Sequence, residues 1–285
     1  MKIDRMEVDD AGANPKRLAE AITKQLGDTP CAVPVRKIAT DIDIHEIRED
    51  PLNGLAGCLI VPEDKSEGAI AVDGKMSEER KRYTIGHEIG HYVNPTHRAS
   101  SPEGFKCTRR DMVTEDAKAG DRHAKMEMEA NQFAAELLMP ATWVKRFLRP
   151  KVGVDLQHIF DLAKLFEVSK EAAAWRYLTF ASEPAAIVFS HDGKVRYIRK
   201  HGEFPRLSVW NGNPMPPDCY SMTNGKDQGE ITDVVEAVGH HWLARSQGIS
   251  LGEQTVAQAN GYRMTLLTAE RISDSDEWEP PRFRR

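Results

Sequence analysis

The chain has 285 residues, of which 40% are hydrophobic and 29% are charged, and its formal net charge is -5. This length can bury one large core or two modest ones, and the mild acidity excludes a general attraction to nucleic acid. The acidic first residues lack the apolar stretch of a signal peptide, and no apolar run has the length of a membrane span.

Helix and strand signals alternate over the first part of the chain. Asn14 and Pro15 suit the N-cap and the first position of a helix that ends near Leu26. A short helix is predicted over residues 35–40 and a strand over residues 42–47.

Two apolar, β-branched runs follow, over Leu55–Val61 and Gly68–Val72. The polar segment between them predicts a turn, so we expect the two runs to form an antiparallel pair of strands. Gly68–Val72 is our candidate for an exposed strand edge that holds an extended substrate by backbone pairing. A plain structural strand is an equally favoured alternative.

A helix is predicted over Glu78–Val93. Ser77 can cap its first turn, and Asn94 followed by Pro95 ends it. Apolar residues recur along the helix at helical spacing, namely Ile85, Ile89, Tyr92 and Val93.

Residues 87–91 of this helix spell H-E-I-G-H, which is an H-E-x-x-H motif. Residues four apart share a helix face, so His87 and His91 can bind one zinc ion through imidazole nitrogens. Glu88 starts beside the open coordination position, where it can accept a proton from the attacking water. The motif therefore predicts the centre of a zinc hydrolase, with Glu88 as its catalytic base.

A catalytic zinc site needs a third protein ligand, and the strong helix predicted from Glu127 to its end at Pro140 offers one. Glu127 lies on the apolar stripe of that helix, so its carboxylate faces the core and needs a partner such as zinc. Glu129 and Glu136 instead share a solvated face. Asn131, one turn after Glu127, can hydrogen-bond a zinc-bound histidine. The alternative for Glu127 is a partly buried acid paired with an arginine.

Three further residues between the two helices are rival ligands. His97 and His123 lie in a polar connection, where a solvated loop histidine is the favoured interpretation. Cys107 could cap the metal as an inhibitory thiolate, but an ordinary loop cysteine is favoured. The four cysteines form no C-x-x-C pair, which predicts reduced thiols in the cytoplasm. An oxyanion donor is also expected, with four equal candidates, Tyr83, Tyr92, His97 and His123.

The segments Arg82–His91 and Glu127–Pro140, in this order, resemble the ImmA/IrrE family of bacterial metallopeptidases. The resemblance covers roughly residues 15–180 and implies a gluzincin-like site, in which two histidines and a helix-borne glutamate bind zinc. In this chain those residues are His87, His91 and Glu127, with Glu88 as the base. The resemblance also implies site-specific cleavage of a partner repressor, usually a helix-turn-helix protein encoded nearby. The long stretch over residues 94–125 departs from the family pattern.

The segment Leu162–Tyr177 resembles a helix-turn-helix, with a turn at Val168 and a helix cap at Ser169. Its second helix offers few side chains that could read bases. Packing is therefore favoured over DNA binding, with partner docking as a third option, and direct DNA binding is not expected.

The pattern of the C-terminal part of the chain predicts a β-rich structure. Asp192-Gly193 and Asn260-Gly261 each lie between alternating runs, which is the signal of a type I′ hairpin. The end of the chain, with mixed charge and Pro280-Pro281, reads as a flexible tail.

We expect an α+β fold in four parts. These are a mostly helical zinc metallopeptidase domain with a small antiparallel sheet (1–140), a helix-turn-helix-like helical segment (141–183), a smaller β-rich domain (184–272) and a flexible tail (273–285).

The predicted function is that of a cytoplasmic zinc endopeptidase, with Mn²⁺ as a substitute for Zn²⁺. Its expected substrate is a helix-turn-helix (XRE-type) repressor whose loss induces stress-response or mobile-element genes, and no membrane partner is expected. One alternative is a metal-stabilised regulatory module that binds DNA or protein without proteolysis. The other is a general, weakly selective peptidase.

Overall fold

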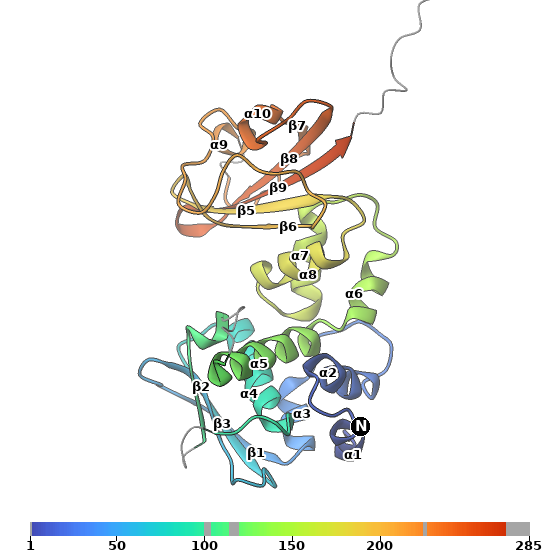
Figure 1. Cartoon of the computed structure of the whole chain (residues 1–285), viewed down its shortest axis with the longest axis vertical. Coiled ribbons are helices and arrows are strands. Elements are labelled where there is room, and N and C mark those ends of the chain that lie inside the picture. Colours follow the sequence, from blue (N-terminus) through green and yellow to red (C-terminus); the bar gives the residue numbers. More distant parts are fainter. Residues whose placement is uncertain (1, 100–103, 114–119, 225–226, 272–285) are drawn as a thin grey trace, which may run out of the picture. The chain divides into compact units, whose positions relative to one another are not determined.

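The computed structural model describes residues 2–99, 104–113, 120–224 and 227–271 (Figure 1). Helices and sheets both occur, as expected for the predicted α+β class. The helices are α1 (Arg5–Asp9), α2 (Pro15–Lys24), α3 (Val35–Asp41), α4 (Glu78–Val93), α5 (Arg122–Leu138), α6 (Ala141–Leu148), α7 (Leu156–Phe166), α8 (Lys170–Phe180), α9 (Tyr220–Thr223) and α10 (Gly239–Trp242). The strands are β1 (Ile44–Asp50), β2 (Leu55–Ile60), β3 (Gly68–Asp73), β4 (Phe105–Thr108), β5 (Ala185–His191), β6 (Lys194–Lys200), β7 (Val235–Glu236), β8 (Ile249–Ala257) and β9 (Tyr262–Arg271).

Contacts within the chain divide it into two units. The first unit is Met1–Pro150 with Leu162–Ala173, and the second is Lys151–Asp161 with Ala174–Arg285. The domain boundaries expected at residues 140 and 183 stay predictions, and the expected tail over 273–285 lies outside the described residues. Across the described ranges, every helix is too short or too polar to cross a bilayer.

The sheet of the first unit has the strand order β1-β3-β2-β4. β2 and β3 are antiparallel, as predicted, and β1 runs parallel to β3 on the other side. The exposed edge expected at Gly68–Val72 is therefore wrong, because β3 has a strand partner on each side. That parallel pairing joins strands that are not neighbours in sequence, and a local alternation pattern carries no information about it.

The edge next to β2 is instead formed by β4, a short strand in the predicted polar connection. Among the described strands, β4 pairs with β2 alone. The pairing has an irregularity, because Thr108 lies opposite Leu55 and Cys107 lies opposite Gly57. This edge strand carries one of the residues of the candidate site.

Helix α4 packs on one face of this sheet, against β2 and β3, and α5 packs against α4 (Figure 1). Ser77 caps α4 as predicted, because its side chain accepts a hydrogen bond from the Arg80 amide. Two glycines of α4 let the helices approach closely: a Cβ on Gly90 would lie 3.0 Å from the Phe133 ring, and one on Gly86 would lie 3.5 Å from the Ala134 Cβ. This close approach brings the acidic residues of α5 to the histidines of α4.

The second unit is built on a five-stranded antiparallel sheet of order β6-β5-β9-β8-β7. Asp192 and Gly193 form the predicted tight turn, with φ angles of 47° and 72°. The second predicted hairpin, β8–β9, is also present, but its connection is longer, because Ala257 pairs with Arg263 around a 3-10 turn at Ala259–Gly261.

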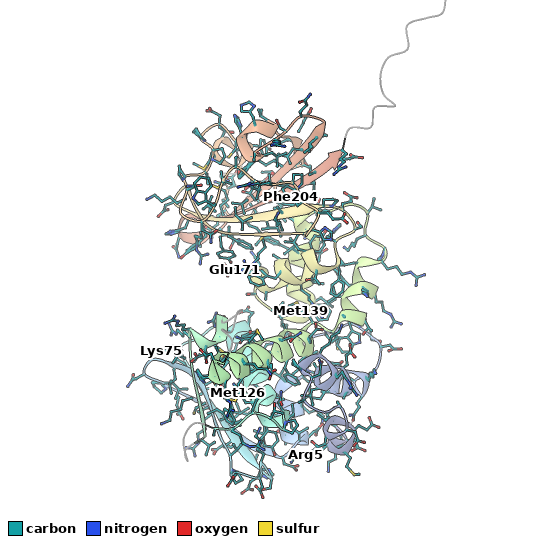
Figure 2. The ribbon with its side chains drawn as sticks, viewed as in Figure 1. Arg5, Lys75, Met126, Met139, Glu171 and Phe204 are labelled. Atoms are coloured by element: carbon teal, nitrogen blue, oxygen red, sulfur yellow. The ribbon has the colours of Figure 1, made fainter. Side chains whose placement is uncertain are left out.

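The core of the second unit contains apolar side chains and one buried acid. Phe204, labelled in Figure 2, is among the buried apolar residues. Glu253 is 1% exposed and accepts hydrogen bonds from the Ser221 amide at 2.7 Å and from Trp242 Nε1 at 2.8 Å. Both carboxylate oxygens are thus satisfied, and this acid ties α9 and α10 to β8.

Candidate metal centre

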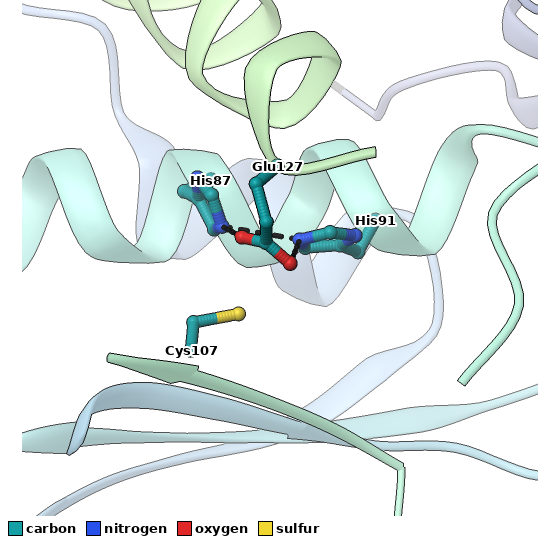
Figure 3. Close-up of side chains that lie close together, drawn as sticks. All are labelled: His87, His91, Cys107 and Glu127. Atoms are coloured by element: carbon teal, nitrogen blue, oxygen red, sulfur yellow. Dashed lines mark hydrogen bonds and ion pairs between the residues drawn. The ribbon is translucent and has the colours of Figure 1, made fainter. Parts of the chain in front are cut away.

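Four buried side chains from three elements converge in the first unit (Figure 3). His87 and His91 come from α4, Glu127 from α5 and Cys107 from β4. Their donor atoms all lie within 4.8 Å of one another, and each residue is at most 2% exposed. Figure 3 shows Glu127 reaching between the two imidazoles, with Cys107 pointing toward them from the opposite side. The structure thus brings the three predicted ligands together and adds a fourth donor.

His87 is oriented by Asn131. The Asn131 Nδ2 group donates to the Asp111 carbonyl at 2.8 Å, which fixes the orientation of the amide. Asn131 Oδ1 then accepts from His87 Nδ1 at 2.9 Å and from the Tyr83 hydroxyl at 3.0 Å. Because Nδ1 donates its hydrogen to Asn131, Nε2 is the ring nitrogen that faces the cluster and is available to a metal ion. The contact predicted for Asn131 is therefore present.

His91 is oriented by a second chain of hydrogen bonds. His97 Nε2 lies 3.0 Å from Glu129 Oε2, and His97 Nδ1 lies 3.0 Å from His91 Nδ1. Burial lowers the pKa of His97 in spite of Glu129, so its ring is neutral. The carboxylate accepts from His97 Nε2, and His97 Nδ1 accepts from His91 Nδ1. His91 Nε2 therefore also presents a lone pair to the cluster.

The spacing of these donors fits a small metal ion. His87 Nε2 lies 3.1 Å from both His91 Nε2 and Glu127 Oε2, and His91 Nε2 lies 3.5 Å from Glu127 Oε1. Ligands about 2.0–2.1 Å from a tetrahedral zinc ion would be about 3.3 Å apart. A cation between these atoms would be attracted by both imidazole nitrogens and by the carboxylate. Nitrogen and sulfur donors suit a transition metal better than magnesium or calcium.

The protonation states of the cluster also favour a metal ion. Burial lowers the pKa of His91 to about 3, so its ring is neutral at pH 7. Burial acts to raise the pKa of Glu127, but the adjacent His87 and His91 rings outweigh it and hold that pKa well below its usual range. Burial and the nearby Glu88 and Glu127 carboxylates raise the pKa of the Cys107 thiol. A Glu127 carboxylate beside the unprotonated His91 ring is the combination in which both groups can bind a cation.

Glu88 lies beside the cluster and is fully buried. Its Oε2 accepts a weak hydrogen bond from Cys107 Sγ at 3.7 Å, and its Oε1 has no hydrogen-bond partner among the described residues. Burial raises the pKa of Glu88 to about 7. A carboxyl group with this pKa and one free oxygen is suited to accept and return a proton.

Gly57 of β2 has no side chain, and the space that a side chain would fill is occupied by the Glu88 carboxyl group. A Cβ at this position would lie 2.7 Å from Glu88 Oε1 and 2.5 Å from Thr84 Cγ2. Both distances are shorter than those observed between real Cβ atoms and their neighbours. Any side chain at this position must therefore displace the glutamate or the helix that carries it.

We therefore expect Gly57→Ala to lower the free energy of unfolding by about 1–3 kcal/mol and to slow any Glu88-dependent reaction while the metal is retained. Denaturant titration and metal analysis of the purified variant measure the two effects. Gly202→Ala is the control, because a Cβ there meets nothing within 4 Å. Equal stability of the two variants would show that Glu88 does not need this space.

The carboxyl end of α4 is held by a buried lysine. Lys65 Nζ donates to the carbonyl oxygens of His91 at 2.5 Å and Asn94 at 2.8 Å. Burial lowers the pKa of Lys65 to about 8. A cation at this end of a helix stabilises its last turn, which here carries His91. No local pattern predicts this contact, because it joins a side chain to backbone oxygens far along the chain.

Three expectations about residues near the site are wrong. His97 is 1% exposed and orients His91, so it is not a solvated loop histidine. Cys107 is 0% exposed and lies on β4, so it is not an ordinary loop cysteine. The Glu129 side chain is only 18% exposed and contacts His97, so it does not lie on a solvated face. In each case the chain after α4 folds back over the site, which helical periodicity cannot indicate.

The four candidates for an oxyanion donor have different surroundings. The Tyr83 hydroxyl donates to Asn131, and the Tyr92 hydroxyl accepts from Arg5, which is labelled in Figure 2. His97 contacts Glu129 and His91. His123, in the first turn of α5, has a side chain that is 57% exposed, and its Nδ1 lies 3.7 Å from Glu127 Oε1. Of the four, His123 is the one that both borders the cluster and reaches solvent.

Comparisons with known proteins show what the part of the chain that carries this site is similar to. The search of solved structures finds a "Mycobacterium tuberculosis transcriptional regulator" that is similar over 93% of this chain and 80% of that chain, with a TM-score of 0.52 and 13% sequence identity. A similarity at this identity shows a shared fold. No curated protein matches. Residues 61–177, which include the H-E-x-x-H motif and Glu127, match the family model Peptidase_M78, so this part of the chain is similar to the IrrE N-terminal-like domain that the model describes.

Proposed function

We propose that this protein is a zinc-dependent endopeptidase that acts in the cytoplasm on one partner protein, a helix-turn-helix (XRE-type) transcriptional repressor. Removal of the repressor would induce stress-response or mobile-element genes. The observation that carries the proposal is Glu88, a buried carboxyl group with a free oxygen beside a cluster of metal-binding donors. A purely structural metal site needs no such base.

Each residue of the site would have a distinct role. His87, His91 and Glu127 would hold zinc, with manganese as a substitute. Zinc acts as a Lewis acid on a peptide carbonyl and lowers the pKa of the attacking water. Glu88 would accept the proton of that water and deliver it to the leaving amine. His123 would donate a hydrogen bond to the oxyanion that develops on the carbonyl.

The edge strand β4 is the proposed place for an extended substrate segment, in the role that the sequence predicted for Gly68–Val72. Among the described strands it has β2 as its one partner, and its residue Cys107 points into the site. Backbone pairing is largely indifferent to the side chains of the substrate. Selection of one repressor would therefore require a second contact, which we assign to the separate β-rich unit.

A second candidate function is that of a metal-stabilised regulator without proteolysis. One observation favours it, namely that Cys107 completes a set of four protein donors, as in structural zinc sites. Burial of an acidic side chain has an unfavourable free energy, and a purely structural metal site does not explain why Glu88 is buried here. We therefore rank this function below the peptidase.

The test is to mix the metal-loaded full chain with the repressor encoded next to its gene and to map the fragments by mass spectrometry. We expect one cut in an exposed segment outside the DNA-binding core, because a folded helix must first open locally to enter the site. The cut should disappear with Glu88→Gln. Many cuts in unrelated unfolded proteins, with the repressor intact, would indicate a general peptidase. Repressor binding without any cut would favour the regulator.

A further inference from the structure

Cys107 occupies a position that the proposed reaction needs to be open. The two histidines and Glu127 come from helices α4 and α5, whereas Cys107 comes from β4 on the opposite side of the cluster (Figure 3). All four donor atoms lie within 4.8 Å of one another. A catalytic zinc site has three protein ligands and leaves the fourth position to water or substrate. A cysteine sulfur is itself a common zinc ligand, and a metal ion deprotonates the thiol that binds it.

Glu88 provides an independent observation about the same position. Its carboxyl group is fully buried, with Oε2 at 3.7 Å from Cys107 Sγ and with Oε1 unpaired among the described residues. The base and the sulfur therefore face the same side of the cluster. A water that is to be activated by Glu88 must occupy the region in which the sulfur lies.

We propose that Cys107 binds the metal as a fourth ligand in the resting protein and thereby blocks proteolysis until its thiolate leaves. This inference rests on the proposed peptidase function and concerns the regulation of that site. Ligation breaks the S–H bond of Cys107, forms a metal–sulfur bond and releases one proton to solvent. Release of the ligand reverses these changes, and no oxidant or reductant is required.

The fold allows this ligand to leave while the other three stay. His87, His91 and Glu127 are fixed on two long helices that pack closely against each other. β4 is a four-residue strand, and the one partner it has among the described strands is β2, to which it is joined by an irregular register. A four-residue strand with an irregular register can open locally at a lower cost than two closely packed helices. An extended substrate that competes for this edge would also draw Cys107 away from the metal.

Cobalt substitution tests the ligation without any assay of activity. The full chain is stripped with a chelator, reloaded with one equivalent of Co²⁺ and examined by absorption spectroscopy. We expect a thiolate-to-cobalt charge-transfer band in the near ultraviolet for the unmodified protein. The band should be absent in Cys107→Ser and present in Cys58→Ser, the matched control on neighbouring strand β2. Its absence in the unmodified protein would overturn the proposal.

The block itself is tested with the zinc-loaded proteins and the repressor. If the thiolate leaves the metal in about one molecule in ten, loss of the cysteine should raise the cleavage rate about tenfold. Cys107→Ala is measured alongside Cys107→Ser, since alanine cannot bind the metal and serine preserves the size of the side chain. An unchanged rate in both variants, or loss of metal from both, would show that Cys107 is not an inhibitory ligand but at most a structural one.

Failure of the peptidase function itself has a different signature. The charge-transfer band would be present and would depend on Cys107, but neither the unmodified protein nor the Cys107 variants would cut the repressor. That result would overturn the inhibitory role together with the peptidase, and it would support the regulator with a structural metal site.

Discussion

Glu88→Gln should lower the rate of repressor cleavage by about 10²- to 10⁴-fold while the protein retains its metal. Glutamine has nearly the shape of glutamate, so it fits the space left by Gly57, but it cannot accept a proton from water. Glu88 is not among the four clustered metal donors, so metal binding does not depend on it. Rates under single-turnover conditions and metal content per chain are the two measurements.

The matched control for this variant is Glu79→Gln, which makes the same chemical change at an exposed position of the same helix. It should cleave at the unmodified rate. Unmodified turnover by Glu88→Gln would show that Glu88 is not the base. Loss of metal or of folding in that variant would show that its carboxylate has a structural role instead.

Glu127→Ala should abolish cleavage by a different route, through loss of the metal. The Glu127 carboxylate is the one anionic oxygen donor of the cluster, and it lies within 3.5 Å of an imidazole nitrogen of each histidine. Without it, two imidazoles and the Cys107 sulfur remain, and the buried site loses the carboxylate that balances part of the charge of a divalent ion. The drop in metal affinity should exceed the 10- to 100-fold that is typical when a residue behind a ligand is replaced. Competition with a chelator of known affinity measures it.

Glu129→Ala provides the comparison for this prediction. Glu129 lies on the same helix but contacts His97, which in turn contacts His91, so it acts on the metal through two intervening rings. Its replacement should lower metal affinity by about 10- to 100-fold and leave a measurable cleavage rate. Equal losses in the two variants would contradict the assignment of Glu127 as the ligand.

The two helices that carry His87, His91 and Glu127 were predictable because they depend on local periodicity. Ser77 caps α4, and the four-residue spacing of His87 and His91 places both rings on one face. The apolar stripe of α5 placed Glu127 toward the core, and the structure buries it there. The position of Asn131, on the same face of the helix as Glu127, was predictable from the same helical geometry. In each case the information lies within one helix, where position along the chain determines direction in space.

The surroundings of this cluster depend on contacts between segments that are distant in sequence. The inner position of β3 comes from its parallel pairing with β1, and the edge position of β4 comes from its pairing with β2. His97 and Glu129 meet because the chain turns back after α4, and Lys65 reaches the end of that helix from a loop. The most consequential of these contacts is Cys107, which local pattern alone assigns to an ordinary loop. The sequence by itself thus determined that His87, His91 and Glu127 face a common point. Only the tertiary structure decided what else approaches them, because periodicity reports the direction of a side chain and not the identity of its neighbour.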